Sequence, residues 1–189
     1  MRVLLICNTD GALYVFRRPI IDALLSQGHE VVTISGRSTY FERLERLGVC
    51  PIALDFSRHS ISPIKNMALL LTLVRLLLMY RPDVVHCFTH KPAIYGALAA
   101  RLAGCSSVLV TITGLGTLFI GDAFSTRILR LLLLMQYKIA LFLVKVVFFQ
   151  NPDDLNYFVS RRILSIKKAV LTHGSGVDLT SYPLPSRER

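Results

Sequence analysis

Tryptophan is absent from this 189-residue sequence, and acidic residues are few, with 12 Asp and Glu against 22 Lys and Arg. Only 18% of the residues are charged and 52% are hydrophobic, which excludes an intrinsically disordered protein. The net charge of +10 favours polyanionic partners such as nucleic acid, anionic lipid or phosphorylated substrates. Because the basic residues are scattered through apolar segments, we expect an anionic membrane surface and no nucleic acid as partner.

The cysteines form no C-x-x-C pair, and no secretory signal precedes the first strand-like run. Three of them lie in or beside apolar strand-like runs, and the fourth follows a helix-ending glycine; they are Cys7, Cys50, Cys87 and Cys105. We therefore expect buried, reduced thiols in a cytosolic protein, and neither a disulfide nor a metal site.

Two apolar segments are candidates for membrane spans. Met67–Met79 is short for a span and contains Arg75, while Leu129–Phe149 contains three basic residues, Arg130, Lys138 and Lys145. A span needs roughly 20 largely uncharged residues, and each central Arg or Lys costs about 2.5–3.5 kcal/mol on insertion. We expect both segments to be helices of the folded domain, the second with a strand after it.

Short apolar runs alternate with helical patterns along the whole chain. Strands are predicted at Val3–Cys7, Glu30–Ile34, Val49–Leu54, Asp83–Phe88, Val108–Thr113, Val146–Gln150 and Ala169–Thr172. Helices are predicted at Phe16–Gln27, around Tyr40–Leu47, at Ser62–Tyr80, Ala93–Ala103 and Ser125–Leu143, and from Asn151 onward. Strands that are apolar throughout have both faces covered. This order predicts the α/β class: a single Rossmann-like, doubly wound, mainly parallel sheet of six to seven strands with helices on both faces.

Ligands of such sheets bind at the carboxyl ends of the strands, where four loops carry polar residues and glycines. The first contains Asp10 and Gly11, and with only one glycine it lacks the G-x-G-x-x-G dinucleotide fingerprint. The second offers His86 and His90 for hydrogen bonds or proton exchange, and Lys91 for a phosphate. Without a third ligand, a metal site is not expected there. One core and one surface histidine would explain the same residues.

The remaining two loops are rich in glycine. Gly114 and Gly116 follow the fifth strand together with Thr113, and they permit a ligand to approach the backbone closely. Gly174 and Gly176 follow the last strand and could line a cleft wall, although a plain turn explains them equally well.

Several segments together carry a resemblance to a known family. They are Gly28–Val31, Arg81–His86, Thr89–Gly96, Thr111–Gly116, Phe149–Asn151 and Gly174–Asp178. This series resembles the N-terminal domain of family 4 retaining glycosyltransferases of the GT-B fold, and it is similar to bacterial capsule, O-antigen and N-glycan precursor enzymes. Two departures stand out: the first loop lacks paired glycines, and Thr113 stands where some members have an active-site histidine.

The resemblance implies two Rossmann-like domains that face each other across a cleft. The first holds the acceptor and leans on the membrane, and the second binds the nucleotide-sugar and supplies a pair of glutamates. Residues 1–180 would be the acceptor-side domain and residues 181–189 the start of the interdomain linker, with the donor-binding domain absent. The expected partners are a nucleotide-sugar, a lipid-linked glycan and an anionic membrane surface, without a metal or cofactor.

The expected activity is transfer of a sugar from a nucleotide-sugar to an undecaprenyl-diphosphate-linked glycan in bacterial surface polysaccharide biosynthesis. It would take place at the cytoplasmic face of the inner membrane, with the protein bound peripherally. The expected catalytic contacts are His90 first and His86 second. Acceptor or phosphate contacts are expected at Asp10, Gly11, Arg17, Lys91, Thr113, Gly114 and Gly116, and the interdomain cleft at Gly174, Ser175, Gly176 and Asp178.

Two alternatives remain open at this point. One is a non-catalytic, membrane-associated subunit of a split enzyme, which binds the acceptor and recruits a separate donor-binding chain. The other is a domain similar to nucleotide-sugar epimerases. In either transferase version, we expect the isolated chain to be inactive.

Overall fold

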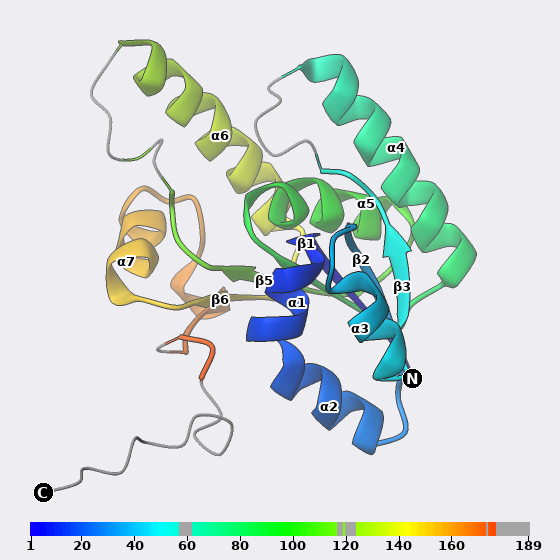
Figure 1. Cartoon of the computed structure of the whole chain (residues 1–189). Coiled ribbons are helices and arrows are strands. Elements are labelled where there is room, and N and C mark those ends of the chain that lie inside the picture. Colours follow the sequence, from blue (N-terminus) through cyan, green and yellow to red (C-terminus); the bar gives the residue numbers. More distant parts are fainter. Residues whose placement is uncertain (57–61, 117–118, 120–123, 173, 177–189) are drawn as a thin grey trace, which may run out of the picture.

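The computed structural model describes residues 1–56, 62–116, 119, 124–172 and 174–176, and it contains one seven-stranded sheet. The strand order is β3-β2-β1-β4-β5-β6-β7, and every neighbouring pair is parallel (Figure 1). The strands are β1 (Arg2–Thr9), β2 (Glu30–Gly36), β3 (Cys50–Ala53), β4 (Val84–Phe88), β5 (Ser107–Ile112), β6 (Val146–Phe149) and β7 (Ala169–Leu171). The predicted Rossmann-like, doubly wound fold is confirmed, with seven parallel strands.

The helices follow the predicted order, with one correction near the amino terminus. They are α1 (Asp10–Phe16), α2 (Arg18–Ser26), α3 (Phe41–Arg46), α4 (Pro63–Tyr80), α5 (Ala97–Leu102), α6 (Phe124–Phe142) and α7 (Pro152–Ser160). A π-helical turn, η1 (Pro92–Gly96), leads into α5, and a 3₁₀ turn, η3 (Ile166–Lys168), leads into β7. The expected loop after β1 is wrong, because Thr9 caps α1 by accepting a hydrogen bond from the Ala12 amide, so the chain turns helical at once.

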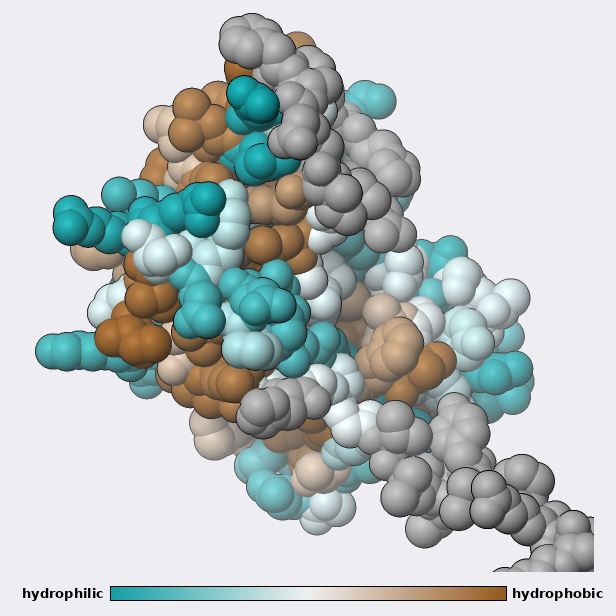
Figure 2. All heavy atoms as spheres, turned by 90° about the vertical axis from the view of Figure 1, so that its left-hand side faces the viewer, coloured by the Kyte–Doolittle hydropathy of each residue, from teal (hydrophilic) through white to brown (hydrophobic). Residues whose placement is uncertain are grey.

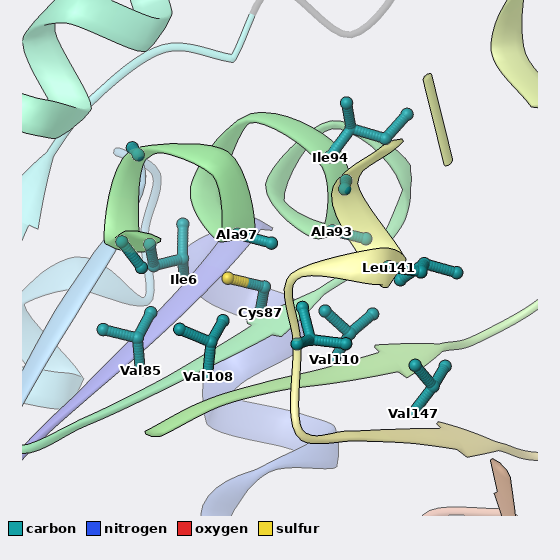
Figure 3. Packing of buried hydrophobic residues seen from close by; sticks show 14 of the residues in the cluster. Ile6, Val85, Cys87, Ala93, Ile94, Ala97, Val108, Val110, Leu141 and Val147 are labelled. Atoms are coloured by element: carbon teal, nitrogen blue, oxygen red, sulfur yellow. The ribbon is translucent and has the colours of Figure 1, made fainter. Parts of the chain in front are cut away.

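The core has two parts, one on each face of the sheet. The smaller part packs α1, α2 and α3 against one face of β1 and β2. The larger part packs α4, η1, α5, α6 and α7 against the other face. Figure 3 shows how valines of the strands meet Ala93 and Ala97. Small residues let η1 approach the sheet so closely that a Cβ on Gly96 would lie 2.9 Å from the Cys87 sulfur.

Three of the four free cysteines are buried, as predicted, and one is not. Cys7, Cys87 and Cys105 lie in the interior. Cys50 is exposed, so the prediction is wrong there. The reason is its position as the first residue of β3, which is the edge strand of the sheet.

Helices α4 and α6 project on the same side of the molecule (Figure 1). Both helices carry large apolar side chains that are exposed. On α4, Leu69, Leu73 and Leu77 are buried, whereas other apolar residues are more than half exposed. Those residues are Ile64, Met67, Leu71, Leu78 and Met79 on α4, and Leu131, Leu132, Met135, Ile139 and Phe142 on α6. Figure 2, which faces the α6 side, shows hydrophobic and hydrophilic side chains interleaved there.

By length and composition α4 could also cross a membrane. This is weak evidence, because a helix of a soluble domain passes the same test and three leucines of α4 are anchored in the core.

Candidate functional site

The end of β4 is held in a strained backbone conformation. Thr89, the first residue after β4, has φ of +70°. A positive φ is unusual for a β-branched residue and costs of the order of 1–3 kcal/mol, so it persists only where the surrounding structure enforces it. The carbonyl of Thr89 accepts from the Ala93 amide, which starts the helical turn η1. π-Helical turns are themselves frequent at functional sites, so two unusual backbone features flank His90.

His90 lies between helix α6 and the glycine bend that follows β5, on the rim formed by the loops at the carboxyl ends of the strands. Its Nδ1 is 2.6 Å from the hydroxyl oxygen of Tyr137 on α6. On the other side, a Cβ on Gly116 would lie 3.0 Å from His90 Nε2, and Gly116 has φ of +73°. The positive φ favours glycine at this position, and a side chain there would press on the imidazole. His90 and Gly116 are therefore neighbours beyond the carboxyl ends of β4 and β5.

Lys91 points towards α4. Its Nζ donates to Asn66 Oδ1 at 3.1 Å, and partial burial lowers the pKa of Lys91 while the carboxylate of Asp55 raises it. Lys91 therefore lies near the ends of both β3 and β4, where its charge can act on an anionic ligand.

His86 is placed differently from His90. It lies in the middle of β4, its Nε2 is 2.8 Å from Thr111 Oγ1, and its ring packs against Phe88 with centroids 4.1 Å apart. Burial, with a contribution from the positive charge of Arg17, lowers the pKa of His86 to about 3. An imidazole that resists protonation at neutral pH is a weak proton acceptor, so the geometry favours a structural position for His86.

Arg17 is buried between α1 and the segment after β7. Its guanidinium lies 4.6 Å from the centre of the Phe88 ring, and Nη1 donates to Ser175 Oγ at 2.8 Å. Gln150 Nε2 donates to the same hydroxyl at 2.7 Å. Burial lowers the pKa of Arg17, and no carboxylate within the described residues forms an ion pair with it. A buried guanidinium that has no carboxylate partner among these residues is well placed to bind an anionic ligand.

Asp10 forms a closed set of hydrogen bonds at the end of β1. Its carboxylate accepts from the Gly11 amide at 2.7 Å, and from the amide and the hydroxyl of Ser38, both at 2.6 Å. Beside it is a cavity of about 390 Å³ at the carboxyl ends of β1, β2 and β3, whose lining includes Tyr40 and Asp55. Asp10 is thus one of the residues that line a cavity on the same edge of the sheet as His90.

The other predicted residues are less informative. Thr113 and Gly114 follow β5 directly, and Gly174 and Gly176 flank the bonded Ser175; their ligand contacts stay predictions. Asp178 and the predicted linker 181–189 lie outside the described residues. Within the part of the chain that the structure describes, no group of three His, Cys, Asp or Glu residues could hold a metal ion.

Sequence reasoning missed Tyr137, Thr89 and Gln150. Tyr137 lies within an apolar helix 47 residues from His90, where nothing in the spacing points to it. The strain at Thr89 leaves no sequence signal either. Only the polar Gln150, at the end of an apolar strand, could have been selected by the rule that ligands bind at strand ends.

Known proteins resemble this chain in sequence and in fold. The model of the family described as "Glycosyl transferase 4-like" matches residues 2–151. The N,N'-diacetylbacillosaminyl-diphospho-undecaprenol alpha-1,3-N-acetylgalactosaminyltransferase of Campylobacter jejuni is 27% identical over 184 residues, which cover 96% of this chain and 48% of that enzyme. The chain therefore spans about half the length of this curated relative.

Solved structures show the same fold at lower sequence identity. MurG of Acinetobacter baumannii superposes with a TM-score of 0.62 at 19% identity, over 97% of this chain and 48% of MurG. A UDP-N-acetylglucosamine 2-epimerase superposes with a TM-score of 0.60 at 14% identity, over 91% of this chain and 48% of the epimerase. Both matches cover about half the length of the longer protein.

Proposed function

The chain belongs to the glycosyl transferase 4-like family, and we propose that it forms the acceptor-side half of a retaining glycosyltransferase. The reaction is transfer of a sugar from a nucleotide-sugar to a glycan linked to undecaprenyl diphosphate. The name of the Campylobacter relative supports this acceptor class and a sugar-transferring activity. The donor-side half corresponds to the part of the relative that this chain does not match, and the nucleotide-sugar serves as co-substrate without a further cofactor.

The observation that carries the proposal is the juxtaposition of His90 and Gly116 at the ends of β4 and β5. Because Gly116 has no side chain, the imidazole and the backbone of the bend lie side by side at the carboxyl ends of the strands, where we expect both to contact a sugar or phosphate oxygen. The strained residue Thr89 immediately precedes His90 in the chain. Catalysis by such a half-site consists of positioning the acceptor hydroxyl and stabilising charge on the leaving diphosphate.

Neighbouring residues provide binding positions for the diphosphate groups and for the acceptor sugar. Arg17 and Lys91 supply positive charge for diphosphate groups. The cavity lined by Asp10 and Gly11 receives a sugar of the acceptor. Tyr40 on the cavity wall offers an aromatic surface to a sugar ring. We propose no role in proton transfer for His86, because its pKa of about 3 keeps the imidazole neutral.

Helices α4 and α6 bring this half-site to the lipid that carries the acceptor. Their exposed apolar side chains are interleaved with basic residues such as Lys65, Arg75 and Lys138, as in helices that rest on an anionic bilayer. We propose peripheral attachment to the cytoplasmic face of the inner membrane. Leu131→Glu should weaken binding of the chain to phosphatidylglycerol vesicles in a flotation assay by about tenfold.

The matched control for this membrane test is Leu102→Glu. Leu102 is 67% exposed, like Leu131 at 60%, but it lies at the end of α5. Equal loss of vesicle binding in both variants would contradict docking through α4 and α6.

The enzymatic test uses a preparation that supplies the donor-side half together with this chain. His90→Ala should reduce turnover by about a hundredfold, while the far-UV circular dichroism spectrum stays unchanged. Because this change leaves the Tyr137 hydroxyl buried without a partner, the double variant His90→Ala, Tyr137→Phe is measured as well. His29→Ala serves as control, because His29 immediately precedes β2 at the opposite, amino-terminal edge of the sheet. Full turnover in the double variant would exclude His90 from the reaction.

The two alternatives differ in what they require. A subunit of a split enzyme would have the same half-site and would differ only in having its donor-side half on a separate chain. An epimerase-like domain is supported only by likeness of fold, whereas the family match and the curated relative both point to sugar transfer. Epimerisation of a UDP-N-acetylhexosamine by the complete protein, without transfer, would favour the epimerase.

A further inference from the structure

Tyr137 connects the interior of α6 with the rim of the proposed acceptor site. Its side chain is completely buried, and its ring meets the Phe158 ring edge-on with centroids 5.2 Å apart. Among the described residues, the hydroxyl has one hydrogen-bond partner, His90 Nδ1 at 2.6 Å. A tyrosine hydroxyl within a core must satisfy its hydrogen-bonding groups or lose roughly 1–3 kcal/mol.

The direction of this hydrogen bond follows from counting donors and acceptors. A neutral imidazole has one N–H and one nitrogen that accepts, whereas a phenol has one O–H donor and an oxygen that accepts. If Nδ1–H donated to the phenol oxygen, the phenolic hydrogen would need a second acceptor, and the described residues provide none. If the phenol donates to Nδ1, its only hydrogen is satisfied. Burial and the charge of Asp154 raise the pKa of Tyr137, so the phenol keeps the hydrogen that it donates.

We propose that Tyr137 is a positioning residue that holds His90 in the Nε2–H tautomer, with this N–H on the side of the ring that faces Gly116. The hydrogen bond between Tyr137 and His90 is present without substrate. Its importance for the reaction rests on the proposed function. With the phenol on Nδ1 and a hydrogen on Nε2, neither ring nitrogen of His90 is left to remove the proton of the acceptor hydroxyl.

Helix α6, which supplies Tyr137, has one buried side and one exposed side. Tyr137, Ala140 and Leu141 form the buried side of α6, while Met135, Ile139 and Phe142 point to the outside. The same helix thus presents its outer side to the proposed membrane surface and uses its inner side to fix His90. The Tyr137 hydroxyl holds the ring at Nδ1, and the strained residue Thr89 comes directly before His90 in the chain.

The first experiment observes the tautomer directly in the 189-residue chain. The ¹⁵N shifts of the His90 imidazole are measured by NMR for the wild type, Tyr137→Phe and the control Tyr157→Phe, which removes a hydroxyl from the same aromatic cluster. We expect a pyrrole-type Nε2 and a pyridine-type Nδ1 in the wild type and in Tyr157→Phe, and a mixture of tautomers in Tyr137→Phe. A pyrrole-type Nδ1 in the wild type, or an unchanged Nε2–H tautomer in Tyr137→Phe, would overturn the proposal.

The second experiment separates this inference from the proposed function. In the complete enzyme, Tyr137→Phe should lower kcat about tenfold and leave the KM for the nucleotide-sugar unchanged. If His90→Ala retains full turnover while the NMR result holds, the proposed function of His90 fails and the positioning by Tyr137 stands. If His90→Ala abolishes turnover but Tyr137→Phe has wild-type kcat and an unchanged tautomer, the positioning fails and the function stands.

Discussion

Asp10 and His90 stand at the carboxyl ends of the adjacent strands β1 and β4, and they differ in how their polar atoms are satisfied. Asp10 is nearly inaccessible and bonds only to groups of its own loops, two of them on Ser38. His90 is only half-buried, follows a strained residue and faces a glycine. The segment after β1 is therefore held rigidly by its own hydrogen bonds. The segment after β4 instead places an imidazole between Tyr137 and a glycine bend.

The largest effect on stability should come from breaking the Asp10 segment. Asp10→Ala removes the acceptor for three hydrogen bonds and should lower the free energy of unfolding by roughly 3 kcal/mol, as measured by urea denaturation. Asp22→Ala, on the exposed side of α2, is the control. A loss for Asp10→Ala as small as that of the control would remove the distinction between the two segments.

A second prediction sharpens the contrast between His86 and His90 through pH. The pKa of His86 is about 3 in the folded chain and about 6.5 when unfolded, so between these values only the unfolded chain binds the proton. This cost to stability is absent above pH 6.5 and grows as the pH falls. Between pH 7.5 and pH 5 the wild type should lose about 2 kcal/mol more than His86→Gln.

The check is a set of denaturation curves for both proteins over this pH range. Parallel loss of stability in the wild type and in His86→Gln would mean that His86 is accessible to protons, as a residue of the open rim would be.

A smaller effect should follow from filling the space beside His90. Gly116→Ala places a Cβ 3.0 Å from His90 Nε2 and should cost about 1 kcal/mol through the positive φ alone. Gly114→Ala also has a positive φ, but nothing lies within 4 Å of its Cβ. Both variants should be destabilised, while only Gly116→Ala should shift the NMR signals of the His90 ring. Equal shifts in the two variants would show that His90 does not rest on Gly116.

The sequence predicted the fold well because the pattern of apolar runs is itself the physical cause of a buried parallel sheet. It failed at Asp10, where a threonine cap converts an expected loop into helix α1, and at Cys50, because strand order decides which strand is the edge. The rule that ligands bind at strand ends found His90 and Gly116. It could not find Tyr137, since a contact across 47 residues depends on how α6 packs. It ranked His90 above His86, but it could not predict the low pKa of His86, since that pKa follows from burial in the folded chain.

The most direct test of the central claim is an NMR titration of the chain with a soluble, short-chain polyprenyl-diphosphate-linked N-acetylhexosamine. If the acceptor binds at the carboxyl ends of β4 and β5, the signals of His90 and Gly116 should shift together and should saturate at the same ligand concentration. The signal of Gly28, on the amino-terminal edge of the sheet, should not shift. Saturable binding that leaves the signals of His90 and Gly116 in place would contradict the account.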